Sequence, residues 1–99
     1  MHDKAVYNIA VGMTLKELQD ERNIDRDKLA AALETDAQSI SKIEHGELRM
    51  TAGELILMID KLDLPWDDFI KRVRAKLPEA AKMMRLSLIH ISEPTRPTT

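Results

Sequence analysis

The sequence is poor in the residue types that build many catalytic and metal sites. Its 99 residues include no cysteine, three histidines, and one each of tryptophan, tyrosine and phenylalanine. The lack of cysteine excludes a disulfide framework, a cysteine zinc site and a thiol nucleophile, and three histidines leave little material for a histidine metal cluster. We therefore expect no metal, no cofactor and no enzymatic activity.

The sequence also lacks long hydrophobic runs and an excess of charge of one sign. No apolar run approaches the roughly 20 residues that a membrane span needs, and Asp3 and Lys4 do not fit a secretory signal. We expect a cytoplasmic protein with no membrane partner. The net charge is −2, from 15 basic and 17 acidic residues, so composition alone does not indicate a nucleic-acid partner.

Prolines and glycines are few, and the long intervals between them favour helices. Between these breakers, apolar residues recur at steps of three and four residues, which is typical of one buried helix face. No segment alternates as a strand would. We predict an all-α fold of five helices: Tyr7 to Arg22, a short helix after Asp25, Ala37 to Glu44, the Thr51 segment to about Leu62, and Pro65 to Leu77.

Capping residues support these boundaries. Asp25 and Asp36 each precede a short helix, and Thr51-Ala52-Gly53-Glu54 fits a capping box. Asn23 suits the left-handed end of the first helix, and Pro78 is expected to close or kink the last one. The predicted inner faces consist of Ile9, Leu15, Leu18, Leu29, Ala30, Leu33, Ile40, Ile43, Leu55, Ile56, Met58, Ile59, Trp66, Phe69, Ile70, Val73 and Leu77.

The last part of the chain differs from the rest. Residues 86–99 lack helical periodicity, and the run LSLIHISEPTR from Leu86 to Arg96 resembles the translation of a sequencing adapter read through at the end of a DNA fragment. We interpret residues 86–99 as an artefactual, disordered tail, and we expect that the natural C-terminus is missing. Ser87, His90 and Ser92 are therefore not treated as catalytic candidates.

The centre of the chain carries the most specific pattern. The run from Leu15 to Ile70, including DAQSISKIEHG from Asp36 to Gly46, resembles without a gap the helix-turn-helix domain of the Cro and phage-repressor (XRE-like) family. The resemblance implies a five-helix repressor-type domain over residues 1–77, with its core in 9–73. A short basic C-terminal extension, residues 78–85, follows it.

The resemblance also implies a DNA-recognition helix at about residues 37–44. Such a helix fits the major groove of duplex DNA. By the resemblance, Gln38 and Lys42 contact base edges, with Ser41 and Ala37 beside them. Arg26 and Arg49 are the candidates for phosphate contacts. For each of these residues, a solvated surface position is the alternative.

Three features depart from the family pattern. Glu34 occupies the turn position that normally holds a left-handed glycine, and Asp36 places a carboxylate where the family commonly has serine or threonine. Between Asp25 and Arg49, four basic and six acidic residues leave a local charge of −2.

In contrast, residues 71–85 contain six basic residues and one acidic residue, a balance of +5. This basic segment could supply phosphate contacts, bind an acidic partner, or be a solvated face.

Two functions follow from these observations. The first is sequence-specific binding of double-stranded DNA by a small transcriptional regulator, such as a repressor, acting as a homodimer. We expect its dimer surface within residues 66–85, with apolar Ile70, Val73 and Leu77. The second is a protein-interaction module on the same scaffold, either an antitoxin-like subunit with a toxin partner or a regulator that docks on a polymerase subunit. The acidic balance of the motif favours the second, and exposed Gln38 and Lys42 favour the first.

Overall fold

Five α-helices make up the described part of the chain, which confirms the predicted all-α fold class. The structure is a computed structural model that describes residues 3–92, with the side chains of residues 4–86. Its helices are α1 (Asp3–Arg22), α2 (Arg26–Ala32), α3 (Ala37–Glu44), α4 (Ala52–Lys61) and α5 (Trp66–Ser92). Across the residues described, no helix combines the length and the apolar character needed to cross a membrane.

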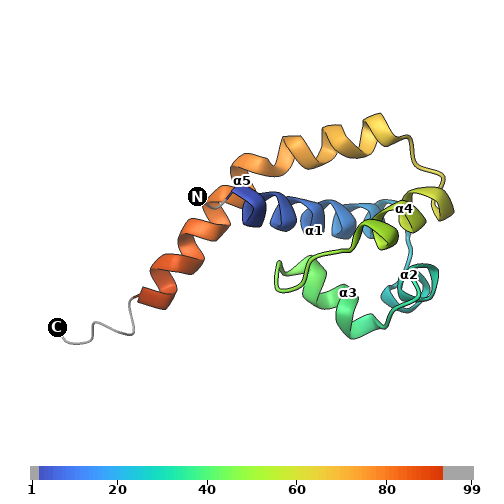
Figure 1. Ribbon diagram of the computed structural model, residues 1–99, viewed down its shortest axis with the longest axis horizontal. Coiled ribbons are helices and arrows are strands. Elements are labelled where there is room, and N and C mark those ends of the chain that lie inside the picture. Colours follow the sequence, from blue (N-terminus) through green and yellow to red (C-terminus); the bar gives the residue numbers. More distant parts are fainter. Residues whose placement is uncertain (1–2, 93–99) are drawn as a thin grey trace.

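Helix α1 lies at the centre of the arrangement (Figure 1). The first part of α5 packs along one side of α1, and α3 packs against α1 on the other side, with α2 beside α3. Helix α4 adjoins α2. Because α1 contacts both neighbours, it separates α3 from the first part of α5.

The predicted caps are present at the starts of α2, α3 and α4. The Asp25 carboxylate accepts a hydrogen bond from the Lys28 backbone at 2.8 Å, and the Asp36 carboxylate accepts one from the Ser39 backbone at 2.7 Å. Thr51 and Glu54 form the reciprocal capping box. Each cap satisfies an amide that the first turn of a helix leaves without a partner.

Three of the helices are followed by a residue that has a left-handed backbone conformation although it is not glycine. Asn23 has a φ of 56°, as expected. Glu34 has a φ of 59° and so keeps the left-handed conformation of the glycine that normally stands at its position. The third, Asp63, with a φ of 53°, was not predicted. Glu34 therefore adopts the conformation that favours glycine, at a cost of about 1 kcal/mol.

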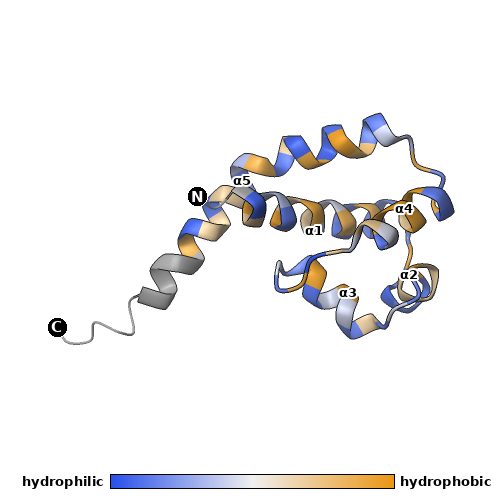
Figure 2. Ribbon diagram, in the orientation of Figure 1, coloured by the Kyte–Doolittle hydropathy of each residue, from blue (hydrophilic) through white to orange (hydrophobic). Residues whose placement is uncertain are grey.

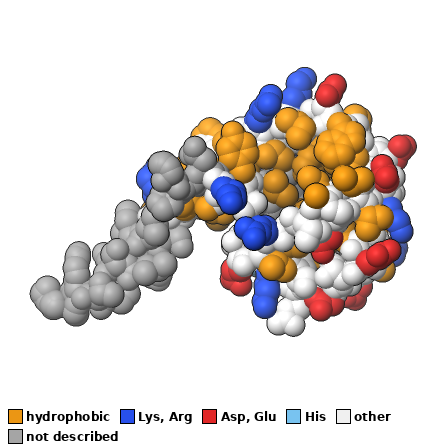
Figure 3. All heavy atoms as spheres, viewed as in Figure 1, with side chains coloured by type: hydrophobic (Ala, Val, Ile, Leu, Met, Phe, Trp, Pro, Cys, Tyr) orange, Lys and Arg blue, Asp and Glu red, His pale blue; other side chains and the backbone are white. Residues whose placement is uncertain are grey.

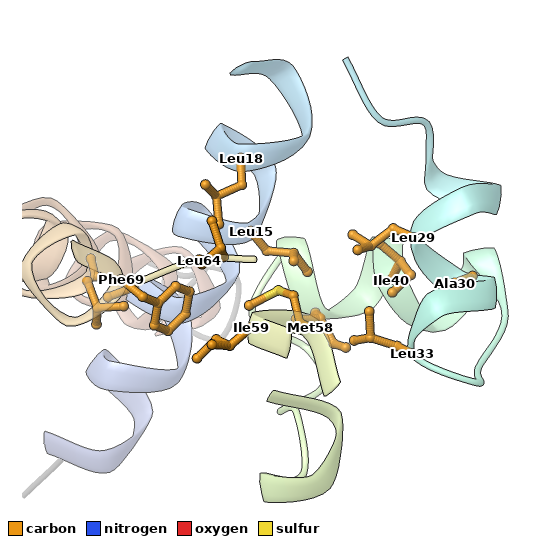
Figure 4. Packing of buried hydrophobic residues seen from close by; sticks show 14 residues of the cluster. Leu15, Leu18, Leu29, Ala30, Leu33, Ile40, Met58, Ile59, Leu64 and Phe69 are labelled. Atoms are coloured by element: carbon orange, nitrogen blue, oxygen red, sulfur yellow. The ribbon is translucent and has the colours of Figure 1, made fainter. Parts of the chain in front are cut away.

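A single hydrophobic core joins all five helices (Figure 4). The buried leucines and isoleucines of α1, α2 and α3 meet Met58 and Ile59 from α4 and Phe69 from α5. Orange, hydrophobic residues accordingly line the inward sides of the ribbons in Figure 2. The fully or nearly fully buried apolar residues are Ala10, Leu15, Leu18, Leu29, Ala30, Leu33, Ile40, Ile43, Met58, Ile59, Leu64, Phe69, Val73 and Ala80.

Three residues expected in the core are exposed instead. Ile56 is 48% exposed, Trp66 is 47% exposed, and Ile70 is also exposed. These residues do lie in helices, as predicted, but on sides of α4 and α5 that no neighbouring helix of the described chain covers. Figure 3 shows hydrophobic side chains gathered on the face of the molecule over α5 and α1.

Gly12 marks the closest approach between α1 and α3. A Cβ placed on Gly12 would lie 2.1 Å from the carbonyl oxygen of Ile43, far inside van der Waals contact. Gly12 is buried in the middle of a helix, where glycine is otherwise unfavourable. The lack of a side chain at residue 12 is thus what lets the recognition-helix candidate pack directly on α1.

Helix α5 continues past the position where we expected it to end. Pro78 lies inside α5, and the helix bends part-way along its length (Figure 1). A proline removes one helical hydrogen bond and its ring crowds the preceding turn, so a bend is the expected result. The backbone remains helical to Ser92, so the disorder expected for residues 86–99 is not found in 86–92. Residues 93–99 lie outside the described residues.

Ion pairs fasten α5 to α1. Arg72 donates from Nη1 to Glu21 at 2.7 Å and to Glu17 at 3.3 Å, and from Nε to Asp68 at 2.9 Å. Lys76 Nζ donates to Glu17 at 2.5 Å. The hydrogen bond from Arg72 lowers the pKa of the Glu21 carboxyl, and the bonds to Glu21 and Asp68 raise the pKa of Arg72.

Candidate nucleic-acid interface

Helices α2 and α3 form a pair of short helices joined by residues 33–36. Leu29, Ala30 and Leu33 from the α2 side face Ile40 from α3, and all four are buried (Figure 4). Small Ala30 lies in this buried contact, as predicted. Since this pair rests on α1, the opposite side of α3 is left facing solvent.

The four predicted base-contacting residues lie on that outer side of α3. Gln38 and Lys42 are exposed, and Ala37 and Ser41 are partly exposed. The two pairs are each four residues apart, so their side chains project from one helix face. Within the described chain, none of the side chains of Gln38, Ser41 and Lys42 forms a hydrogen bond or ion pair. Their polar groups are available to a partner.

The two phosphate candidates have different surroundings. Arg49 is exposed in the connection between α3 and α4, after Glu47 and Leu48, whose amides bond to the Lys42 carbonyl. Arg26 is the first residue of α2, and its guanidinium is engaged by the protein itself. Arg26 thus bonds to the last residue of α3, whereas Arg49 lies in the connection that follows α3.

Arg26 is paired with the last residue of α3. Its Nη2 and Nε donate to Oε1 of Glu44 at 3.0 and 3.3 Å, and Gln19 of α1 donates to the other carboxylate oxygen. The sequence interpretation missed this triad because 18 residues separate Arg26 from Glu44. The signal available in the sequence was a glutamate at the end of a helix whose last turn favours cations.

The Asp36 carboxylate caps the start of α3. The hydrogen bond from the Ser39 backbone lowers the pKa of the Asp36 carboxyl. A lowered pKa means that the cap stabilises the fold above the unfolded pKa, and that this stability is lost as the pH falls through the folded pKa. The carboxylate thus stays ionised at neutral pH, at the start of α3, where a DNA phosphate would meet a negative charge.

The basic segment 71–85 divides into two parts. Arg72 and Lys76 are used in the ion pairs with α1. Lys71, Arg74, Lys82 and Arg85 are exposed. Since α1 lies between α3 and the first part of α5, Lys71 and Arg74 do not join the outer face of α3 in one surface (Figure 1).

Comparison with known proteins gives a structural match. No family model matches the chain, and no curated protein matches its sequence. The chain is similar to the crystal structure of the clp gene regulator ClgR from Corynebacterium glutamicum, with a TM-score of 0.68 and 17% sequence identity. The match covers 93% of this chain and 96% of the other. At this identity, the likeness shows a shared all-helical fold.

Proposed function

We propose that this protein is a small transcriptional regulator that binds double-stranded DNA sequence-specifically, with α3 in the major groove. The observation that carries the proposal is the outer face of α3, where the side chains of Gln38, Ser41 and Lys42 have no partner among the described residues while the inner face is buried in the core. A shared fold with a protein described as a gene regulator supports the same role.

Each residue of the interface has a proposed part. Gln38 can pair with adenine through two hydrogen bonds, and Lys42 can donate to guanine acceptors. Ser41 can reach a base or a phosphate, and the methyl group of Ala37 can contact a thymine methyl. Arg49 is proposed to contact a phosphate, and Arg26 lies where α2 begins, a second point of approach to the backbone.

Selection from random duplexes at low salt tests this proposal. We expect one motif to be enriched, and we expect Gln38→Ala or Lys42→Ala to lower discrimination at one base position by about 1–3 kcal/mol. Arg49→Ala should weaken binding to all sequences alike. Lys71→Ala, which removes a cation from the far side of α1, is the control and should leave the sequence preference unchanged.

We further propose that the protein acts as a homodimer. Trp66 and Ile70 are exposed and four residues apart, so they project from one face of α5 next to buried Val73. Exposed apolar side chains in such an arrangement are typical of an association surface. Two copies of α3 would then read half-sites about 34 Å apart, roughly one turn of DNA.

Replacing both exposed residues tests the dimer. We expect Trp66→Ser combined with Ile70→Ser to give a monomer in sedimentation, and to weaken binding to a paired half-site far more than binding to a single half-site. Leu48→Ser, which removes an exposed apolar side chain from the connection between α3 and α4, serves as the control. An unchanged sedimentation coefficient in the double variant would rule out this surface.

A protein-interaction module is the second candidate function. The local charge of −2 between Asp25 and Arg49 favours it, because acidic side chains repel phosphates. The exposed apolar residues of α4 and α5 favour it as well. If the selection enriches no motif, DNA binding should be rejected in favour of a toxin-like or polymerase partner.

A further inference from the structure

The end of α3 holds a buried carboxylate that DNA binding by itself does not require. The side chain of Glu44 is only 2% exposed, although it belongs to a charged residue. Gln19 donates to one of its oxygens and Arg26 to the other. A carboxylate is buried at a large cost unless it is paired and hydrogen-bonded, and here both conditions are met.

The Arg26 side chain connects this buried charge to the surface. Two of its nitrogens, Nε and Nη2, donate to Glu44, and the side chain remains 44% exposed. In the part of the chain that the structure describes, Nη1 has no acceptor. Arg26 therefore has one edge held against the protein, and a remaining nitrogen that can meet an anion from outside.

We propose that Glu44 sets the charge that the start of α2 presents to DNA, by neutralising Arg26 from inside the fold. This inference rests on the proposed DNA-binding function. A phosphate that approaches Nη1 meets a guanidinium whose positive charge is already compensated by a carboxylate about 3 Å from its other edge. Such a pair releases few counterions when DNA binds, so Arg26 contributes geometry but little sequence-independent attraction.

The consequence concerns the affinity for DNA of any sequence. Attraction to phosphates strengthens binding to every sequence equally, whereas base contacts strengthen binding to one. By limiting the attraction to phosphates, Glu44 keeps the affinity for random DNA low and leaves discrimination between sequences to α3. Glu44 is in this sense a positioning residue, since it acts on DNA through Arg26.

Glu44→Gln is the decisive variant. Glutamine retains an oxygen that accepts from Arg26, and its amide can donate to Gln19 once the Gln19 side chain turns over, so the hydrogen bonds survive while the charge is lost. We expect tighter binding of a short random-sequence duplex, by about threefold to tenfold at low salt, and a steeper salt dependence by up to about 0.9 in the slope of log K against log salt. Binding to the selected site should tighten by the same factor.

A cycle with Arg26→Gln separates this effect from its alternatives. In the Arg26→Gln background, Glu44→Gln should leave the salt slope unchanged, because no guanidinium remains at residue 26 to displace counterions from DNA. Asp60→Asn changes the net charge by the same amount as Glu44→Gln, at an exposed position of α4. It should leave the slope at the wild-type value. Circular dichroism and urea unfolding would establish that each variant is folded before its slope is compared.

The outcomes are distinct. If the slope steepens equally with and without Arg26, or if Asp60→Asn reproduces the change, the neutralisation of Arg26 is refuted while DNA binding stands. If the slope of Glu44→Gln equals that of wild type, the role of Glu44 is structural only and the inference fails. If the wild-type chain binds no duplex at any salt concentration, the proposed function fails first and the inference falls with it.

Discussion

Replacing Gly12 with alanine is expected to destabilise the protein by about 3 kcal/mol. The new Cβ would lie 2.1 Å from the carbonyl oxygen of Ile43, and that oxygen belongs to the backbone of α3. Backbone atoms cannot rotate aside as a flexible side chain can, so α3 must move away from α1. The core between the two helices would open as a result.

Helix propensity alone predicts the opposite sign. Alanine is favoured over glycine inside a helix by about 1 kcal/mol. Gly53 provides the matched control, since a Cβ there meets nothing nearer than the Thr51 hydroxyl at 4.0 Å. In urea unfolding followed by circular dichroism, Gly53→Ala should therefore be neutral or stabilising. A Gly12→Ala variant as stable as the wild type would show that α1 and α3 are not in direct backbone contact.

The second large effect is expected from Phe69→Ala, at about 3–5 kcal/mol. Phe69 is 2% exposed and points into the core toward Ile59 (Figure 4), so truncation leaves a cavity where α5 meets the rest of the domain. Trp66 is larger but about half exposed. We expect Trp66→Ala to cost at most about 1 kcal/mol in the monomer.

Thermal or urea unfolding at low protein concentration distinguishes the two aromatics. A dilute sample matters because Trp66 is part of the proposed dimer surface, and association would add stability that depends on concentration. If Trp66→Ala proved as destabilising as Phe69→Ala in dilute solution, α5 would have to be rotated so that Trp66 lies inside. The sequence-based prediction that Trp66 is buried would then be correct.

Local signals in the sequence were sufficient to predict the starts of α2, α3 and α4. The caps at Asp25, Asp36 and Thr51 and the left-handed Asn23 and Glu34 depend on residues within a few positions of one another. Such interactions can be read from spacing because the chain itself brings the groups together. The presence of five helices and the buried faces of α2 and α3 could thus be predicted, but the start of α1 and the end of α5 could not.

Features that depend on distant segments could not be predicted in the same way. Spacing places Ile56, Trp66 and Ile70 on apolar faces, but it does not reveal how far a neighbouring helix extends over those faces. The contact between Gly12 and Ile43 could not be predicted, because it joins residues far apart in the chain. The pairing of Arg26 with Glu44 could not be predicted for the same reason, since 18 residues separate them.

The site was predicted only in part. That α3 would present Gln38 and Lys42 outward follows from helix geometry once Ile40 and Ile43 are inside. Whether these side chains contact bases remains a prediction. The treatment of Arg26 as a simple phosphate ligand was incomplete, because a lone sequence position carries no information on a buried counter-charge such as Glu44.

The central position of α1 also constrains the order in which the protein can fold. Helices α2 and α3 are neighbours in sequence, so their contact closes a short loop and can form early. The packing of α5 on α1 joins opposite ends of the domain, through bonds such as that from Lys76 to Glu17, which span 59 residues. During synthesis, one side of α1 must therefore stay uncovered until α5 has left the ribosome, and the domain reaches its full stability only then.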